Sequence, residues 1–279
     1  MRLGIALPTE DVADAPAGAG TRILGPDSLA EGARRIEAAG FDSGWVFDSI
    51  GRGFLLPEPL IAISIAATVT RRIELGTGVL QLPLRNTMDL AHRILTAHLV
   101  CNGRLRLGVG AGSTPADFAA LGMDFASRFR GLDESLATMK RLWAGERVGD
   151  AQLGTWPAAA GGPPIFIGSW AGSRWIERAA REFDGWVASG ARSSWQKVTE
   201  GIKRFRDLGG TRAILTNVHV NLESPSPSAD GPDDPFNLLC SPDVARARLA
   251  HVRNLGYDDV VLVSRRHDAA TLKELRSLI

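Results

Sequence analysis

The amino-acid sequence predicts an α/β fold, namely a single (β/α)8 TIM barrel with an extended loop after the seventh strand. The chain has 279 residues, close to the roughly 250 residues of one such barrel. Short β-branched runs alternate with amphipathic helical segments eight times, without a strong hairpin signal, which indicates a parallel sheet. A parallel sheet closes into a barrel at about eight strands, whereas the alternative, an open doubly wound sheet, usually has about five or six. We therefore expect residues 1–279 to form one barrel domain.

The expected strands are short runs rich in Val, Ile, Leu and Gly. In chain order they are Leu3–Leu7, Asp42–Asp48, Arg72–Leu80, Arg104–Gly110, Ile165–Gly168, Gly185–Ser189, Arg212–Val220 and Asp259–Val263. The helical segments between and after them are Ser28 to about Gly40, Pro59–Thr70, Thr87–Cys101, Pro115 to about Ala144, Ser173–Glu182, and three that begin near Ser193, Pro242 and Asp268. Capping signals mark four of the helix starts. They are Asp27-Ser28 with Glu31, Ser193 with Gln196, Ser241-Pro242, and Asp268.

Two connections are longer than the usual few residues. Gly145–Pro164 follows helical material, so we expect it to run along the bottom or side of the barrel. Leu222–Leu239 is rich in Pro, Ser and Asp and follows the seventh strand, so it leaves from the face where barrel active sites lie. It is either a lid over the site or a surface loop.

Composition excludes several classes of partner. The formal net charge of +1 gives no basic field that would indicate nucleic acid or an anionic membrane. No apolar stretch approaches the roughly 20 residues of a membrane span. The apolar start, Met1–Leu7, soon meets Glu10 and Asp11, which is unlike a signal peptide. With Cys101 and Cys240 alone, we expect no disulfide framework and a cytoplasmic protein.

Several catalytic and metal-binding motifs are absent from the sequence. Gly108–Ser113 is glycine-rich but has Ser where a dinucleotide-binding fingerprint needs its third Gly. There is no Gly-Lys pair for a Walker motif, no zinc-binding H-E-x-x-H or paired C-x-x-C, and no G-x-S-x-G nucleophile elbow. His92 and His98 are six residues apart, the wrong spacing for two ligands on one helix face. We therefore expect no metal site.

Glycines gather at the carboxyl ends of three expected strands. They lie in Gly76–Val79, Gly108–Gly112 and Gly168–Gly172. Glycine inside a strand marks a bulge, a bend or the close approach of a ligand, and free backbone N–H groups at the third stretch would suit an anion. The alternative interpretation is that these glycines merely form tight turns.

Five stretches in order, spanning most of the chain to about Gly190, carry a family resemblance. They are Glu37–Asp48, Arg72–Pro83, Gly103–Gly112, Phe118–Trp143 and Pro163–Trp186. Together they resemble the luciferase-like monooxygenase family, which includes bacterial luciferase, alkanesulfonate monooxygenases and F420-dependent reductases. The last third of the chain is similar in its strand rhythm alone. The resemblance implies a (β/α)8 oxidoreductase that uses a flavin or a deazaflavin.

The resemblance also implies where the cofactor, FMN or coenzyme F420, lies. In the family a non-prolyl cis peptide at the end of the third strand backs the central ring of the flavin, and it maps to Thr77, Gly78 and Val79. Gly110 and Gly112 would let the ribityl or phosphate arm approach. A phosphate-gripping turn, with a serine hydroxyl and backbone N–H groups as donors, is matched by Gly168, Ser169, Ala171 and Gly172.

Several positions depart from the family pattern. Ser49 follows Asp48 where many members carry a His that works near the reactive ring edge. Ala111 aligns with the phosphate-binding Arg of the luciferases. Arg85–Thr87 stands where His-Pro is common, and His98 replaces a common Asp. These departures concern proton transfer and the hold on the phosphate, and they leave the fold expectation unchanged.

Asp48 and Ser49 are the catalytic candidates, with Arg85 nearby. Asp48 would orient a proton donor or accept a hydrogen bond, and Ser49 would donate to substrate or cofactor; the alternative for both is a turn residue. Arg85 would meet an anionic substrate or the phosphate, or lie solvated on a loop. Among the tryptophans, Trp170 is expected to line the pocket, whereas Trp45 and Trp186 are expected in the core.

The function expected from these residues is FMN-dependent oxidation or monooxygenation of a small organic molecule. The first alternative is F420-dependent hydride transfer without oxygen. A second is a flavin-binding member without catalysis, because the family His is absent at Ser49. A barrel of unrelated chemistry would need a Schiff-base Lys or metal carboxylates at strand ends, and no expected strand end carries a Lys. As partners, the resemblance implies a flavin or F420 reductase and a homodimer.

Overall fold

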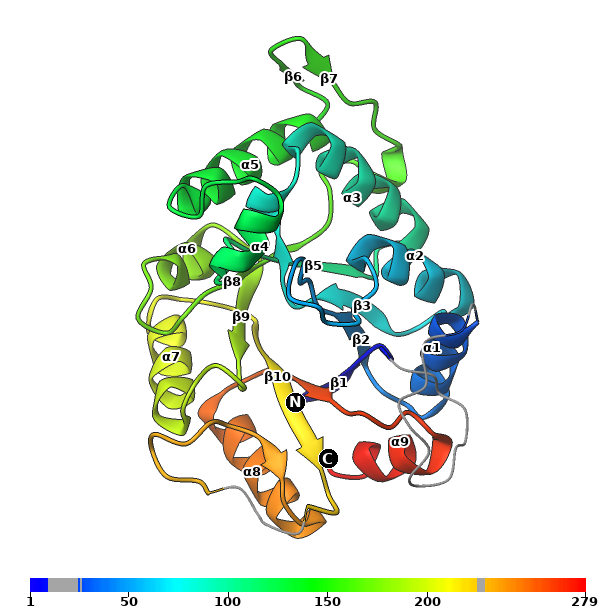
Figure 1. Ribbon diagram of the computed structural model, residues 1–279, viewed down its shortest axis with the longest axis vertical. Helices are drawn as coiled ribbons and strands as arrows, with labels where there is room; N and C mark the ends of the chain where they lie inside the picture. The colour runs from blue at the N-terminus through cyan, green and yellow to red at the C-terminus, as the bar shows by residue number, and fades with distance from the viewer. Residues whose placement is uncertain (10–24, 26, 225–228) are drawn as a thin grey trace.

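Eight parallel strands form a closed barrel inside a ring of helices in the computed structural model, which describes residues 1–9, 25, 27–224 and 229–279 (Figure 1). The strands of the barrel are β1 (Arg2–Ala6), β2 (Ser43–Val46), β3 (Glu74–Thr77), β5 (Leu105–Gly110), β8 (Ile165–Gly168), β9 (Gly185–Ser189), β10 (Ala213–Asn221) and β12 (Asp259–Val263). They follow one another around the barrel in chain order, and β12 pairs with β1 to close it. The expected TIM barrel is confirmed.

One expected strand, Arg72–Leu80, is wrong in detail. It divides into β3 and a separate short strand β4 (Leu80–Gln81), which pairs with β5. Between them lies a cis peptide bond joining Gly78 and Val79. The hydrophobic pattern shows no break here, because the glycines and apolar residues continue across the whole stretch. The family resemblance did imply a non-prolyl cis peptide at these residues, and its position is confirmed.

The helices lie outside the strands and cover the barrel (Figure 1). They are α1 (Ser28–Ala38), α2 (Pro59–Val69), α3 (Thr87–Cys101), α4 (Pro115–Ala120), α5 (Arg128–Trp143), α6 (Trp175–Arg181), α7 (Trp195–Asp207), α8 (Pro242–Leu255) and α9 (Ala269–Arg276), with 3-10 turns η1 (Leu82–Leu84) and η2 (Pro157–Ala159). The expected helix from Pro115 to Ala144 is thus two helices. Within the described residues, no helix is long and apolar enough to span a bilayer.

Two of the expected caps are confirmed and two are wrong. Asp268 accepts from the backbone N–H of Thr271, and Pro242 occupies the first turn of α8. At α1, the side chain of Asp27 makes no capping hydrogen bond. At α7, the cap is Ser194 rather than Ser193, because the Ser194 hydroxyl accepts from the next turn of the helix.

The long connection Gly145–Pro164 contains structure that the sequence did not indicate. Strands β6 (Arg147–Val148) and β7 (Ala151–Gln152) form an antiparallel hairpin. Figure 1 shows this hairpin at the top of the view, extending beyond α5 and the ring of helices. It lies away from the barrel axis, so it takes no part in the cavity described below.

The middle of the barrel is filled by an apolar layer. It consists of Trp45, Phe166, Val187, Ile214 and Val261, with Val79 packed against it. Trp45 is fully buried, and a Cβ on Gly76 would lie only 2.5 Å from its ring. Gly76 therefore makes room for Trp45 inside the barrel rather than for a ligand. The apolar layer fills the barrel below the carboxyl ends of the strands.

Below this layer, the amino-terminal end of the barrel is closed by ion pairs. Glu74 contacts Arg2 at 2.6 Å, Arg212 at 2.7 Å and Arg106 at 2.5 Å. Arg212 also binds both carboxylate oxygens of Asp259 at 2.9 Å. Burial alone would raise the pKa of Glu74, but hydrogen bonds from Arg212 and Arg2 and the charges of Arg212 and Arg106 lower it to about 2. The amino-terminal end of the barrel is therefore closed by a partly buried network of charged side chains.

The loop Leu222–Leu239 is partly anchored on the barrel. Its residues 225–228 lie outside the described part of the chain. Its end forms β11 (Leu238–Leu239), parallel to β10. The fully buried Phe236 packs edge-on against Trp195, and the backbone N–H of Trp195 donates to the carbonyl of Asp234. The loop therefore packs on the β9–α7 connection, and its action as a lid stays a prediction.

Candidate active site

A cavity of about 470 Å³ opens at the carboxyl ends of the strands, a size in the range of small-molecule and cofactor sites. Residues at the ends of β5, β8, β9 and β10, and residues that follow β2, β3, β5, β8 and β9, line it. Of the predicted site residues, the lining includes Asp48, Ser49, Gly78, Val79, Gly110, Gly112, Gly168 and Ser169. Thr77, Ala171 and Gly172 are not part of it. Trp170, expected at the pocket, lines it and is 47% exposed, while Trp45 and Trp186 lie in the core.

The cavity floor is the cis peptide between Gly78 and Val79. A Cβ on Gly78 would lie 3.1 Å from the ring of Phe47 and 3.5 Å from the methyl group of Thr216. Thr77 lies just beneath, fully buried, and its hydroxyl donates to the carbonyl of Gly108 at 2.6 Å. Thr77 therefore joins β3 to β5 and holds the floor in place without facing the cavity.

The glycines at the ends of β5 and β8 make room for a protein side chain. A Cβ on Gly110 would lie 2.8 Å from Val79 Cγ2, and one on Gly168 would lie 2.6 Å from Val79 Cγ1. Gly112 has a φ of +83°, and its Cβ would lie 2.6 Å from Gln81 Oε1. The packing of Val79 and Gln81 therefore explains why glycine stands at positions 110 and 112, whereas the sequence analysis expected the approach of a phosphate arm. Both still line the cavity.

Asp48 is held by the fold on both carboxylate oxygens. Arg85 donates Nη1 to Oδ2 at 2.6 Å and Nη2 to Oδ1 at 2.9 Å. The backbone N–H of Gln81 donates to Oδ2 at 2.9 Å. The Asp48 side chain is 2% exposed and that of Arg85 is 16% exposed. Arg85 is thus neither a solvated loop residue nor part of the cavity lining, and Asp48 is a hydrogen-bond acceptor that the fold already uses.

Four buried polar groups that line the cavity have no hydrogen-bond partner among the described residues. They are the hydroxyls of Ser49, Ser169 and Ser189 and the indole N–H of Trp175. A buried polar group without a partner costs about 1–3 kcal/mol, so native structures seldom leave several such groups together. Their grouping around one cavity indicates that a ligand supplies the missing partners.

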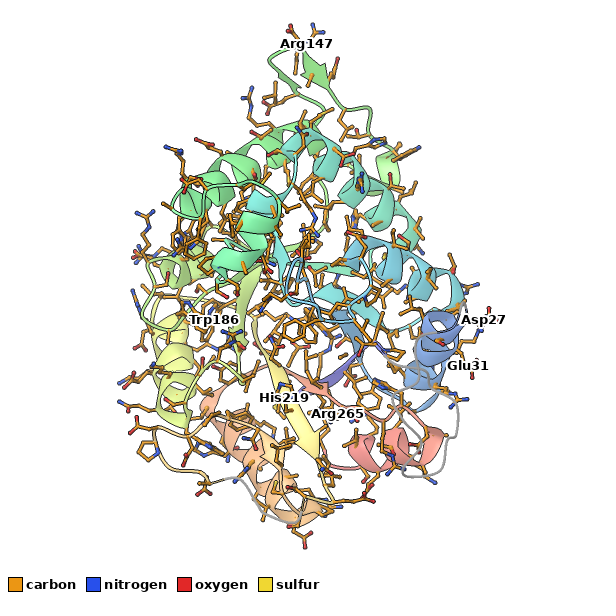
Figure 2. The ribbon with its side chains drawn as sticks, in the orientation of Figure 1. Asp27, Glu31, Arg147, Trp186, His219 and Arg265 are labelled. Atoms are coloured by element: carbon orange, nitrogen blue, oxygen red, sulfur yellow. The ribbon has the colours of Figure 1, made fainter. Side chains whose placement is uncertain are left out.

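The turn between β8 and α6 is fixed from below. Trp186 Nε1 donates to the carbonyl of Ser169 at 3.1 Å, and Arg204 Nη1 donates to the carbonyl of Ala171 at 3.0 Å. Trp186 stacks against Tyr257 on the outer face of β9, and Figure 2 labels it there. These two hydrogen bonds hold the backbone of the turn, and they leave the Ser169 hydroxyl without a partner among the described residues.

Polar residues that the sequence reasoning missed also line the cavity. They include Arg52 after β2, Arg192 after β9, and Asn217 and His219 on β10. Asn217 adopts a φ of 55° at an irregularity in the pairing of β10 with β12. Partial burial and the nearby charge of Arg265 lower the pKa of His219; both residues are labelled close together in Figure 2. The sequence signal that could have identified these residues is their position at or just after the carboxyl ends of predicted strands.

Comparison with known proteins places this geometry in a family. The family model for luciferase-like monooxygenases matches residues 1–215. The chain belongs to this family. A curated relative, 4-hydroxyprotoasukamycin monooxygenase of Streptomyces nodosus subsp. asukaensis, is 35% identical over 48% of this chain and 39% of its own length. The F420-dependent glucose-6-phosphate dehydrogenase of Amycolatopsis mediterranei is 35% identical over 45% of this chain and 40% of its own. The matches thus span less than half of these relatives.

Solved structures share the fold over the whole chain. The oxygenating constituent of 3,6-diketocamphane monooxygenase from Pseudomonas putida, solved in complex with FMN, has a TM-score of 0.73. It is 16% identical, and the alignment covers 100% of this chain and 97% of that one. At this identity the likeness establishes the barrel and no residue roles. Luciferase-like enzymes are oxidoreductases, and their use of FMN or F420 defines the cofactor to be tested here.

The residues of this luciferase-like chain fit a flavin or deazaflavin. The floor at Gly78 and Val79 carries no polar side chain and suits a flat ring. The Ser169 carbonyl accepts from Trp186, and the Ser169 hydroxyl, which has no partner among the described residues, suits a phosphate or ribityl oxygen. In the described residues no group of three metal-ligating side chains lies together.

Proposed function

We propose that this chain is an FMN-dependent oxidoreductase that oxygenates a small organic substrate. The observation that carries the proposal is the set of unpartnered donors, Ser49, Ser169, Ser189 and Trp175, around one cavity. A ligand rich in carbonyl, hydroxyl and phosphate oxygens would satisfy these donors. The isoalloxazine ring, ribityl chain and phosphate of FMN provide such acceptors.

In this proposal the ring lies on the Gly78–Val79 floor and the phosphate lies toward Ser169. Ser169 and Ser173 both line the cavity at the β8–α6 turn, and Ser113 lines it at the end of β5. Because β5 and β8 are neighbours in the barrel, these three hydroxyls belong to adjacent turns. Ala171 and Gly172, predicted as phosphate ligands, would support the turn from outside the cavity. This arrangement keeps the ring at the barrel axis and the charged end at the wall.

Reduced FMN bound there would supply the electrons with which molecular oxygen is split, one atom entering the substrate and the other leaving as water. Ser49 follows β2 beside the floor, so its free hydroxyl is the donor we assign to the ring edge or substrate. Asp48 orients this segment and does not exchange a proton, because Arg85 occupies both of its oxygens. The apolar lining, with Phe47 and Val79, would keep bulk water from the ring.

F420-dependent hydride transfer is the competing function. One of the two curated relatives described above is an F420-dependent glucose-6-phosphate dehydrogenase. Hydride removal from an alcohol requires a base that accepts the hydroxyl proton. Asp48 is engaged by Arg85, and the histidine among the described lining residues, His219, lies on β10 and not after β2, where the family carries its His. Oxygenation does not need a base for a substrate hydroxyl, and this difference favours FMN.

A separate reductase would supply the reduced cofactor in this proposal. The structure in complex with FMN is named an oxygenating constituent, which describes one part of a larger system. A homodimer also stays a prediction, and sedimentation of the purified protein measures it.

The test is binding followed by turnover. Purified protein is titrated separately with FMN and with F420, and binding is read from the spectral shift; FMN binding is expected to be the tighter. Gly78→Val, which fills the floor, should weaken binding about tenfold or more. Gly154→Val is the matched control, because Gly154 does not line the cavity and its Cβ would meet nothing within 4 Å.

Three results contradict the proposal. Failure of the wild-type protein to bind either cofactor removes the oxidoreductase function. Tighter binding of F420 replaces FMN by the deazaflavin. Tight FMN binding with no oxygenated product from a panel of small organic substrates, in the presence of reduced FMN and oxygen, identifies a flavin-binding protein without catalysis.

A further inference from the structure

Arg52 is a cavity-lining arginine that the fold holds by one end. It lies in the β2–α2 connection, and its Nε donates to Asp117 Oδ1 at 3.1 Å. The Arg52 side chain is 23% exposed, whereas that of Asp117 is fully buried. The Phe54 ring covers one face of the guanidinium, with its centroid 5.2 Å away. A side chain so held loses little further freedom when it binds a ligand.

The Asp117 carboxylate is itself fixed by a second polar side chain. Gln81 Nε2 donates to Asp117 Oδ2 at 3.2 Å and to the carbonyl of Asp48 at 3.1 Å. The other amide atom, Gln81 Oε1, lies 2.6 Å from where a Cβ on Gly112 would stand. The contact with Asp117 therefore places the arginine against α4, the helix that follows β5.

The terminal nitrogens of Arg52 are available to a ligand. An arginine carries five N–H donors in a planar fork, and the one on Nε is used by Asp117. Among the described residues, no hydrogen bond or ion pair involves Nη1 or Nη2 of Arg52. A guanidinium presenting such a fork matches the geometry of a phosphate group.

We propose that Arg52 binds the cofactor phosphate in place of the arginine that the luciferases carry at the position of Ala111. The charge comes from the β2–α2 connection instead of from β5, and Asp117 is its positioning residue. Ala111 and Arg52 line the same cavity, and Ser169 lines it at the end of β8, the strand that pairs with β5. The inference rests on the proposed function, because it requires a flavin or deazaflavin phosphate in this cavity.

Arg192 is the rival for the same role. It lines the cavity after β9, and no described residue pairs with it. It is exposed, however, and neither a carboxylate nor an aromatic ring fixes it, so binding would cost the freedom of the whole side chain. The same change of charge at Arg192 is therefore the matched control for Arg52.

The test compares each cofactor with its phosphate-free form. FMN and riboflavin share the ring and the ribityl chain. The dissociation constant of riboflavin divided by that of FMN therefore isolates the contribution of the phosphate, and this ratio falls when the phosphate loses a contact. If the wild type prefers F420, then F420 and its phosphate-free deazaflavin core form the pair. Dissociation constants are measured by fluorescence quenching for the wild type, Arg52→Gln, Arg52→Lys and Arg192→Gln, with a thermal melt of each to confirm folding.

Arg52→Gln should weaken FMN binding roughly 10- to 100-fold and change riboflavin binding less than about twofold. Arg52→Lys keeps the charge without the fork and should lose part of that preference. Arg192→Gln should keep the wild-type ratio. Asp117→Asn should lower the ratio less than Arg52→Gln does, since it frees the guanidinium without removing it.

The contrary results are distinct. Equal weakening of FMN and riboflavin by Arg52→Gln shows a general effect on the cavity and overturns the phosphate role. A ratio that falls in Arg192→Gln and not in Arg52→Gln assigns the phosphate to the other arginine. A wild-type protein that binds neither FMN nor F420 overturns the proposed function, and this inference with it.

Discussion

Arg85 and Asp48 form a two-pronged ion pair, with Nη1–Oδ2 at 2.6 Å and Nη2–Oδ1 at 2.9 Å. The pair joins the connection after β4 to the end of β2, at the wall of the cavity. Because the Asp48 side chain is 2% exposed, its charge depends on Arg85 for compensation. Asp48 therefore shapes the wall of the cavity through hydrogen bonds that engage both of its oxygens.

The first prediction is that Arg85→Gln destabilises the protein by about 2–4 kcal/mol. Removing one partner of a buried pair leaves the other charge uncompensated and typically costs about 3–5 kcal/mol, and the 16% exposure of Arg85 reduces this. Urea unfolding measures the change. Arg93→Gln is the control, because the Arg93–Asp89 pair is exposed on both sides and should contribute less than about 0.5 kcal/mol. Equal effects of the two substitutions would show that Asp48 does not need Arg85.

The second prediction compares the hydroxyl of Ser49, which we assign to a ligand, with that of Thr77, which stabilises the fold. The Ser49 hydroxyl has no partner in the described protein, so Ser49→Ala should leave the free energy of unfolding unchanged or raise it by up to about 1 kcal/mol. Turnover with reduced cofactor should fall at the same time. Thr77→Val removes a hydroxyl that donates to Gly108 and should cost about 1–2 kcal/mol of stability. Stability that falls as much in Ser49→Ala as in Thr77→Val would argue against a ligand role for Ser49.

Much of the fold could be predicted because the strands are short and sharply bounded. Ile165–Gly168, Gly185–Ser189 and Asp259–Val263 were predicted to the residue, since each is an apolar run between polar or turn-forming residues. The break of the third strand at Gly78 and Val79 could not be predicted from hydrophobicity, because both sides of it are apolar. The capping box at Asp27 failed because the Ser28 hydroxyl accepts from the backbone N–H of Gly25, while Glu31 N–H donates to the carbonyl of Asp27 and not to its side chain.

The site was predictable in its location and less so in its contacts. Strand ends of a barrel converge on one face, so Ser49, Gly78 and Ser169 meet in one cavity. The ion pair between Arg52 and Asp117 joins residues 65 positions apart, and no periodicity in the sequence records it. Glycine is required at positions 110 and 168 because the Val79 side chain lies against both, and the direction of that side chain is defined only in the folded chain.

The third prediction tests that dependence on Val79. A Cβ on Gly110 would lie 2.8 Å from Val79 Cγ2 and no nearer than 3.8 Å to anything else. Gly110→Ala should therefore destabilise the protein by about 1–3 kcal/mol, as overpacking does, and weaken cofactor binding. The double variant Gly110→Ala, Val79→Ala should recover much of the stability lost in the single variant, measured by urea unfolding in a double-mutant cycle. Strict additivity of the two changes would mean that Gly110 is required for another reason.

The fourth prediction concerns acid stability and the ion cluster under the barrel. Glu74 has a pKa lowered to about 2 in the folded protein, against 4.5 for an ordinary glutamate. A group whose folded pKa is depressed stabilises the protein above its unfolded pKa, and the stabilisation disappears as the pH falls through the folded one. The contribution of Glu74 is thus complete above about pH 4.5 and is lost between pH 4.5 and 2. The size of the shift corresponds to a contribution on the order of 3 kcal/mol.

Glu74→Gln should consequently be less stable than the wild type at pH 7, and the difference should shrink as the pH falls from about 4.5 toward 2. Urea unfolding at pH 7, 5, 4 and 3 measures both curves. Glu134→Gln is the control, because Glu134 is 70% exposed and lies 4.0 Å from an equally exposed Arg130, so its curve should follow the wild type. Because the arginines Arg2, Arg106 and Arg212 converge on Glu74, a parallel fall of the Glu74→Gln and wild-type curves below pH 4.5 would show that other carboxylates, not Glu74, compensate these charges.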